Sequence, residues 1–290
     1  MQRPLKPDRP AVDLAAIRGR HPQHFARLDR QRLQTALVGV AAFALLLFGM
    51  AELGFFGGTL LSGSLRLVEI TRLMLPPDPG DGAHARTFGV ALLETIAIAF
   101  LGTLSAAVLG LPLALLAARN VTVARLVRFL SRRSLDTIRS VDILVWALIW
   151  INVVGLGPFA GALAIMTADL GTFGKLFSEA MEAADKKPVE GIVSTGGSHA
   201  QAIRFGILPE VFPVLASQVL YYFESNTRSA SIIGIVGAGG IGLYLAEAIR
   251  TLELQQTSFI IVLILVAVAL IDFVSSQLRF AVIGRRGAMA

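Results

Sequence analysis

The chain has 290 residues, of which 54% are hydrophobic and only 16% are charged, and its mean hydropathy is +0.69. Soluble domains carry about a quarter charged residues, so this composition excludes an ordinary soluble enzyme and indicates an integral membrane protein. The sequence has no cysteine, which excludes disulfide frameworks, thiolate metal sites and cysteine nucleophiles.

Four runs without a charged residue are long enough to cross a bilayer, since a spanning helix needs about 20 apolar residues. They cover residues 33–51, 95–118, 143–168 and 254–271. The first run starts too far from Met1 for an ordinary secretion signal and lacks a small-residue cleavage site. We therefore interpret it as a retained helix.

Arginine and lysine mark the cytoplasmic ends of membrane spans. The tail 1–32 is basic and the loop 119–139 contains six arginines, whereas the connection 52–86 contains three arginines interspersed with acids. The tail and the arginine loop are therefore predicted to lie inside. The net charge of +6 is concentrated in these blocks beside apolar runs, which indicates orientation in a membrane rather than nucleic-acid binding.

This distribution predicts an all-α bundle of about six transmembrane helices with both termini inside. The expected spans are 33–53, 88–118, a helical hairpin over 141–177 that is broken at Gly155–Pro158, 207–223 and 257–278. The segment 234–242 is then expected on the outer side, where it dips into the membrane or lies on its surface. Glu94 and Asp142 lie near predicted membrane ends and are interpreted as interfacial anchors.

The segment "GIVGAGGIGLYLAEAI" has the spacing of a dinucleotide fingerprint, with glycines at 237, 239, 240 and 242. A Rossmann site also needs strands on both sides of the glycines, and the next long segment is another apolar run. We therefore predict no nucleotide cofactor here. The glycines indicate close approach of the backbone to a facing subunit, a docking protein or an anion.

The most informative polar stretch is "EAMEAADKKPVEGIVSTGGSHAQAIRFGILPEV", residues 179–211. Pro188 and the pair Gly196-Gly197 predict a short helix, a turn and a second helix that runs into the membrane. A solvated loop is the simpler alternative. His199 has no second ligand nearby, so we expect a surface residue rather than a metal site.

This stretch resembles the EAA loop of ABC importer permeases, with the pattern E-A-A, three residues, G, nine residues, I, one residue, L-P. Glu190, Gly196 and Leu208-Pro209 fall on the matching positions. Gly191 and Ile192 stand where two alanines are usual, and Gly206 stands where isoleucine is usual. The spacing from Glu190 to Pro209 is kept.

Longer stretches between residues 87 and 283 are similar to the permease subunit of phosphonate ABC transporters. The E-x-N-x-R element formed by Glu224, Asn226 and Arg228 is the most specific of them. The resemblance implies a type I ABC importer permease fold in a bacterial inner membrane. It divides the chain into a cytoplasmic tail (1–32), a first transmembrane helix and outer loop (33–86), the permease domain (87–283) with a coupling loop at about 178–209, and a cytoplasmic end (284–290).

The resemblance further implies a homodimer, two copies of an ABC ATPase and an extracytoplasmic phosphonate-binding protein. The chain has no G-x-x-x-x-G-K-[ST] sequence, so we expect the partner ATPase to bind ATP and magnesium. The residues implied in coupling to the ATPase are Glu190, Gly191, Ser194, Thr195, Gly196, Leu208 and Pro209. Those implied in the translocation pathway or outer gate are Glu224, Asn226, Arg228, Gly237, Gly239, Gly240 and Gly242.

Arg228 has two interpretations. Its guanidinium matches the oxygens of an anionic phosphonate, or it pairs with Glu224 one helical turn away and only positions the loop. Asp272 is expected to pair with Arg279 or a neighbouring helix. The expected substrate is phosphonate, and phosphate or phosphite could also be carried. The alternative functions are a permease for another small solute such as methionine and a stand-alone secondary transporter. A secondary transporter would favour internal repeats, and the sequence has no second copy of the glycine element.

Overall fold

The computed structural model describes residues 30–55 and 59–287, and these residues form helices and turns without a strand. The chain divides into two compact units, residues 1–69 and 70–290. The first unit contains α3 (Arg30–Glu52) and most of α4 (Thr59–Leu73). The described side chains of α3 are apolar on all sides and mostly exposed, as expected for a helix that faces lipid.

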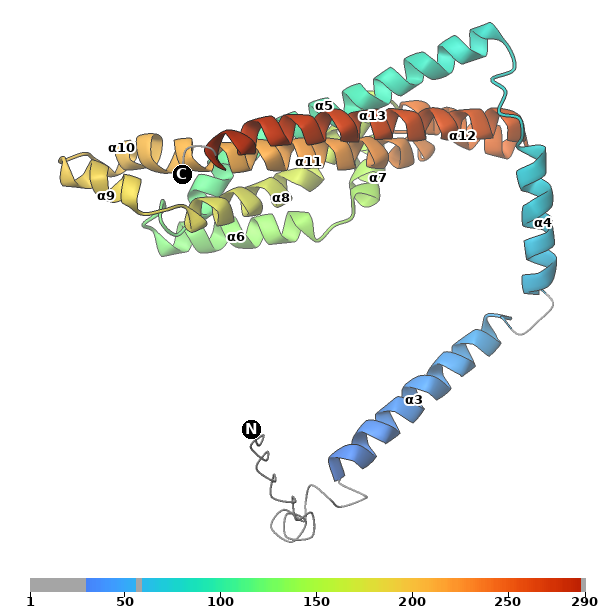
Figure 1. The fold of residues 1–290 in the computed structure, drawn as a ribbon, viewed down its shortest axis with the longest axis horizontal. Helices are drawn as coiled ribbons and strands as arrows, with labels where there is room; N and C mark the ends of the chain where they lie inside the picture. The colour runs from blue at the N-terminus through green and yellow to red at the C-terminus, as the bar shows by residue number, and fades with distance from the viewer. Residues whose placement is uncertain (1–29, 56–58, 288–290) are drawn as a thin grey trace, which may run out of the picture. The chain divides into compact units, whose positions relative to one another are not determined.

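The second unit is a bundle of long helices with a helical extension at one end. Its elements are α5 (Gly82–Ala117), α6 (Arg125–Arg139), α7 (Ile143–Val154), α8 (Pro158–Ala183), α9 (Lys187–Ser194), α10 (His199–Gln201), the π-helix η1 (Ala202–Ile207), α11 (Leu208–Ile235), α12 (Ile241–Arg250) and α13 (Leu254–Gly287). Figure 1 shows α9 and α10 at one end of this bundle and α12 towards the other, with α11 running between them.

The centre of the bundle is the contact between α5 and α8, which is the most extensive helix pair of the second unit. Small residues make this contact possible. Ala106, Ala114 and Ala164 are fully buried, and a Cβ added at Gly102 would lie 2.7 Å from the Cβ of Ile165. In a membrane, helices associate through close packing rather than through exclusion of water, so small residues at the contact allow the backbones to approach.

Local signals explain where the helices begin and end. The Asp81 carboxylate accepts a hydrogen bond from the His84 amide (2.7 Å) at the start of α5, and Asp142 accepts one from the Leu144 amide (2.8 Å) at the start of α7. The predicted break at Gly155–Pro158 is confirmed, because α7 ends at Val154 and Pro158 begins α8. Asp142 thus caps α7.

The all-helical fold class is confirmed, but the predicted count of about six crossings is not reproduced. In the described ranges, four helices are long and apolar enough to span a membrane: Leu33–Glu52, Gly82–Ala117, His199–Ile235 and Leu254–Ala281. A fifth is reached if α6 and α7, which meet at 88°, form one broken span. The expected hairpin over 141–177 fails because α7 has 12 residues, about 18 Å, and cannot cross alone.

The expected end of the span 207–223 is also wrong. Helix α11 continues without interruption to Ile235, so Glu224, Asn226 and Arg228 lie inside a helix and not in a loop before the glycines. The sequence suggested an early end because these three polar residues interrupt the apolar run. Glu224 and Asn226 are instead paired with side chains of neighbouring helices, and Arg228 pairs with Glu224 on α11 itself, which lets the helix continue.

We predict opposite effects for the same substitution at two positions of α5. Gly102→Ala should destabilise the bundle by about 1–3 kcal/mol, because the new methyl group meets Ile165. Gly89→Ala should be neutral or stabilising by up to about 1 kcal/mol, because nothing lies within 4 Å and alanine favours helix. Thermal unfolding of the two purified variants in detergent measures this difference, and equal midpoints would contradict the packing described for α5 and α8.

Candidate functional site

The first group of predicted site residues lies in α9 and the turn after it. The helix begins at Lys187 with Pro188 in its first turn, as the sequence predicts. It ends in a Schellman motif: the Gly196 amide donates to the Val193 carbonyl and the Gly197 amide to the Ile192 carbonyl, both at 3.0 Å. Gly196 has a φ of +82°, a conformation that glycine adopts without strain.

Helix α9 rests on η1 through Val189 and Ile192. A Cβ at Gly206 would lie 3.2 Å from Val189 Cγ2 and 3.3 Å from Ile192 Cδ1, so position 206 has little room for a side chain. This contact explains two departures from the EAA pattern together. The large Ile192 replaces a small residue at the point where the small Gly206 replaces a large one.

The opposite face of α9 is exposed. Four of the predicted coupling residues lie there or at the end of the helix, namely Glu190, Gly191, Ser194 and Thr195, and Gly196 is exposed in the turn. Val193 is 56% exposed and Phe205 on η1 is 61% exposed, so the surface also has apolar contacts to offer. Leu208 is half-buried and Pro209 is exposed in the first turn of α11, beside a hollow of about 340 Å³.

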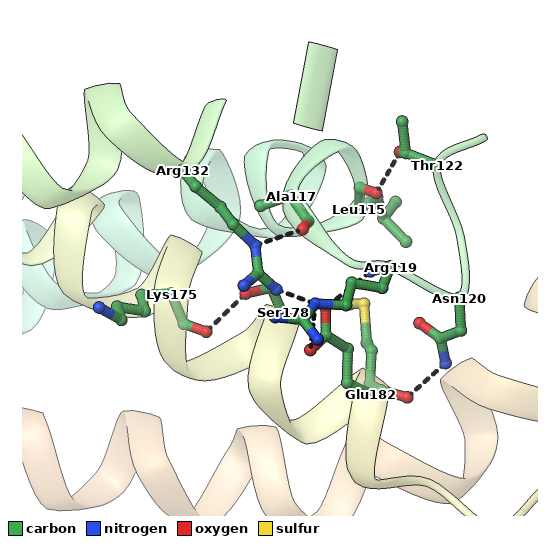
Figure 2. A network of polar contacts seen from close by, with 10 residues as sticks. Leu115, Ala117, Arg119, Asn120, Thr122, Arg132, Lys175, Ser178 and Glu182 are labelled. Atoms are coloured by element: carbon green, nitrogen blue, oxygen red, sulfur yellow. Dashed lines mark hydrogen bonds and ion pairs between the residues drawn. The ribbon is translucent and has the colours of Figure 1, made fainter. Parts of the chain in front are cut away.

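A polar junction centred on Glu182 lies where α8 leads into this segment (Figure 2). Its carboxylate forms an ion pair with Arg132 of α6 and accepts a hydrogen bond from the Arg119 amide (2.7 Å). Arg132 Nε also donates to the Ala117 carbonyl (2.9 Å), and Asn120 Nδ2 donates to the Met181 carbonyl (2.6 Å). The ends of α5, α6 and α8 are therefore joined by charge-assisted hydrogen bonds.

The far end of the segment is tied to the same loop. His199 Nε2 lies 2.9 Å from the Val121 carbonyl, to which it donates, and this side chain is exposed, as predicted. The loop 118–124 thus contacts the entrance of the α9 segment through Glu182 and its exit through His199. These two contacts therefore link both ends of the α9 segment to the loop between α5 and α6.

Sequence reasoning missed the junction. The sequence does contain a signal for it: Glu182 is an acidic residue near the expected inner end of a span, and the loop 119–139, which is expected on the same side, contains six arginines. Helix α6 also contacts α8 through charged residues. Arg132 pairs with Glu182, and Lys175 Nζ of α8 donates a hydrogen bond to Asp136 Oδ1 (2.8 Å). Leu126, Phe129 and Leu130 of α6 are exposed. Leu135 is buried against Gly171 and Gly174 of α8, so α6 contacts α8 through both charged and apolar side chains.

The glycine segment is a tightly packed turn. Ala238 and Ile241 are fully buried, and Gly239 and Gly240 are buried as well. The Gly157 amide donates to the Gly237 carbonyl (3.0 Å), and a Cβ at Gly239 would lie 2.6 Å from the Pro158 nitrogen. The backbone does approach something closely, but its neighbours are α5 and the turn between α7 and α8 of the same chain.

Two side chains of α5 cap the helix that follows these glycines. The Gly240 amide donates to Glu94 Oε1 (3.0 Å) and the Ile241 amide donates to Thr95 Oγ1 (2.8 Å). Glu94 was expected as an interfacial anchor, and its carboxylate instead occupies the position where the N-terminus of α12 would attract an anion. Gly242 packs against Ser231 and Gly234 of α11, which brings α11 and α12 together.

The E-x-N-x-R element of α11 contributes residues to two separate polar clusters. Glu224 is 8% exposed and lies between two arginines: Arg228 Nη1 is 3.4 Å from Oε1, and Arg279 Nη1 of α13 is 3.3 Å from Oε2. The expected pairs of Arg228 with Glu224 and of Asp272 with Arg279 (3.8 Å) are therefore both present.

Asn226 points into the centre of the bundle. Its Nδ2 donates to Thr103 Oγ1 of α5 (2.8 Å) and to the carboxylate of Asp169 of α8. All three side chains are buried, at 6% exposure or less. Because an unpaired amide or carboxylate is costly at such a place, this cluster fixes the three helices in one register. In the described ranges, no group of three acidic or histidine side chains could hold a metal ion.

The contact between Ile192 and Gly206 can be tested by exchanging the two volumes. Gly206→Ile alone should displace α9 and lower its protection from amide hydrogen exchange at least about tenfold, because overpacking a tight contact costs about 1–3 kcal/mol. The double variant Ile192→Ala with Gly206→Ile should recover most of this protection. Equal exchange in the single and double variants would contradict the contact.

Comparisons with known proteins agree with the architecture. The profile of the family described as "Binding-protein-dependent transport system inner membrane component" matches residues 110–286. A solved structure of the MetNI methionine ABC transporter in an inward-facing conformation has a TM-score of 0.61 at 21% sequence identity, covering 70% of this chain and 99% of that chain. This structural likeness concerns the fold.

Closer similarity is found to permease subunits of transporters for phosphorus compounds. The putative phosphite transport system permease protein HtxC of Stutzerimonas stutzeri is 38% identical over 222 residues, which cover 77% of this chain and 78% of that protein. A putative cryptic phosphonate transport system permease protein of Escherichia coli K12 is 52% identical over 117 residues, 40% of this chain and 96% of that protein. The chain therefore belongs to the family of binding-protein-dependent transport system inner membrane components, and it is a multi-pass permease subunit of an ABC importer.

Proposed function

We propose that this permease imports phosphonate or phosphite, that is, anions with oxygen atoms around one phosphorus atom. The observation that carries the proposal is the similarity over 77% of the chain to a permease named for phosphite, together with a relative named for phosphonate. The paired arginines of α11 and α13 support it, because guanidinium groups bind such oxygens in a bidentate manner.

The proposed complex contains two copies of this chain, two ABC ATPase subunits and an extracytoplasmic binding protein. In it, the ATPase subunits bind ATP and magnesium, and this chain hydrolyses nothing. A stand-alone transporter is excluded by membership of the binding-protein-dependent family. Native mass spectrometry of the purified complex should give two copies of the chain, whereas one copy beside a different permease would replace the homodimer.

In this proposal the exposed face of α9 docks on the ATPase. The small Gly191 and the exposed Val193 let the partner approach the helix, and the Schellman turn at Gly196 keeps the end of α9 rigid. Motion of α9 would pass through Glu182 and His199 to α5 and α6. It would also pass through η1 into α11, which begins at Leu208-Pro209 and reaches the glycine turn about 40 Å away.

The substrate class can be tested with the reconstituted importer. Uptake of a labelled phosphonate into proteoliposomes that contain the permease, its ATPase and its binding protein should require ATP. Unlabelled phosphite or phosphonate should compete, and methionine should not, because a carboxylate with an ammonium group lacks the tetrahedral oxygens. Competition by methionine alone would replace the proposal with an amino-acid importer, a class that the fold also accommodates.

The docking face can be tested at Gly191, which has nothing within 4 Å of an added Cβ. Gly191→Glu should leave the chain folded and in the membrane but reduce uptake per ATP hydrolysed at least about tenfold, because a bulky charge is placed in the contact. Gly191→Ala, the residue usual at this position of the EAA loop, should retain uptake.

A substitution at Gly191 tests docking without disturbing the fold. At Gly196, by contrast, any side chain would also strain the turn, because this residue has a positive φ. Normal coupling in Gly191→Glu, with ATPase activity and uptake both measured, would remove α9 from the ATPase contact.

A further inference from the structure

A membrane-embedded group of four charged residues connects α11 and α13. Each oxygen of the Glu224 carboxylate takes one guanidinium, Arg228 on Oε1 and Arg279 on Oε2. Arg279 has a second partner, Asp272, at 3.8 Å from Nη2. The two arginines therefore differ in their partners. Arg279 pairs with the carboxylates of Glu224 and Asp272, whereas Arg228 pairs with one oxygen of Glu224.

The exposure of the two guanidiniums is also unequal. The side chain of Arg279 is 23% exposed and that of Arg228 is 51% exposed, although Arg228 lies only one turn from the buried Glu224. Arg228 is seven residues, or about 10 Å, before the end of a helix that is apolar enough to span the membrane. A half-exposed guanidinium at this depth is too costly in contact with hydrocarbon, so this face of α11 meets water or a second protein chain.

We propose that Arg228 is the anion-binding group of the translocation pathway and that Glu224 is a built-in competitor for it. When the pathway is empty, the Glu224 carboxylate occupies the guanidinium of Arg228. A phosphonate or phosphite anion arriving from the binding protein takes that place with two of its oxygens, and Glu224 remains neutralised by Arg279. This inference rests on the proposed function, because it assigns a residue to that substrate class.

Competition by the Glu224 carboxylate would help the site to release its substrate. A transport pathway must bind its substrate strongly enough to admit it and weakly enough to release it. The four groups together are neutral, two positive and two negative, so the empty site carries no excess charge that would hold an anion tightly. Return of Glu224 to Arg228 then favours release. Arg279 is the positioning residue, since it holds Glu224 within reach of Arg228.

The test measures binding of labelled phosphite to the assembled permease and ATPase complex by equilibrium dialysis, without the binding protein and with a non-hydrolysable ATP analogue present. Arg228→Gln should weaken binding at least about tenfold, because a charge-assisted bidentate contact is lost. Glu224→Gln should instead tighten binding, because it removes the competitor. Arg228→Lys should fall between the wild type and Arg228→Gln.

Arg125→Gln is the matched control, because it removes the same charge at the exposed first residue of α6, outside this group of four residues, and it should bind as the wild type does. Size-exclusion chromatography with the ATPase verifies that each variant is assembled. A purely structural pair predicts that Arg228→Gln and Glu224→Gln, which break the same contact, shift the dissociation constant in the same direction, or leave it unchanged; either result overturns the inference.

The uptake experiment on the wild type separates the two proposals. Wild-type import of phosphite together with unchanged phosphite binding by Arg228→Gln overturns the assignment of Arg228 and leaves the proposed function standing. Wild-type uptake that neither phosphite nor phosphonate supports removes both. Methylphosphonate in place of phosphite should give the same order of variants, because the contact is made by the oxygens that the two anions share.

Discussion

The constraint on which this bundle depends is that a polar group inside the membrane must find its partner within the protein. Asn226 contacts Thr103 and Asp169, Glu224 contacts two arginines, and Glu94 accepts a hydrogen bond from the Gly240 amide just before α12. Apart from the pair of Glu224 with Arg228 within α11, these contacts join different helices or turns. The small residues along α5 and α8 let the backbones come close enough for short side chains such as Thr103 to reach across.

Local features of the sequence predicted much of the architecture, because they act over a few residues. Pro188 begins α9, the segment around Gly155 breaks a helix, and Gly196 ends one. Contacts between distant residues could not be predicted from spacing. Glu94 and Gly240 are 146 positions apart, and the sequence contains no rule that brings them together. The end of the span in α11 was missed for the same reason: polar residues end a span in a hydropathy pattern, whereas in the bundle Glu224 and Asn226 are paired with other helices and α11 continues.

The α9 segment shows how departures from a family pattern can compensate each other. Taken singly, Ile192 and Gly206 depart from the EAA pattern, yet the Ile192 side chain packs against the backbone at Gly206, and the volume gained at one position is lost at the other. The exposed face that we propose as the ATPase contact and the packing surface against η1 therefore lie on different sides of the same short helix. The exposed face keeps the small Gly191, so the exchange on the inner face leaves the outer face free to follow the pattern.

The glycine turn has a mechanical consequence. Its amides are held by Glu94 and Thr95 of α5, and its carbonyl at Gly237 by the turn before α8, so three parts of the bundle are fastened at one point. Helix α11 is a rigid lever about 40 Å long, and a tilt of about 5° at Pro209 would displace this point by about 3.5 Å. A displacement of that size exceeds the tolerance of a hydrogen bond. A movement of α11 at this end therefore has two possible forms. Either the glycine turn moves together with α5 as one rigid body, or the hydrogen bonds of the Gly240 and Ile241 amides to Glu94 and Thr95 break together.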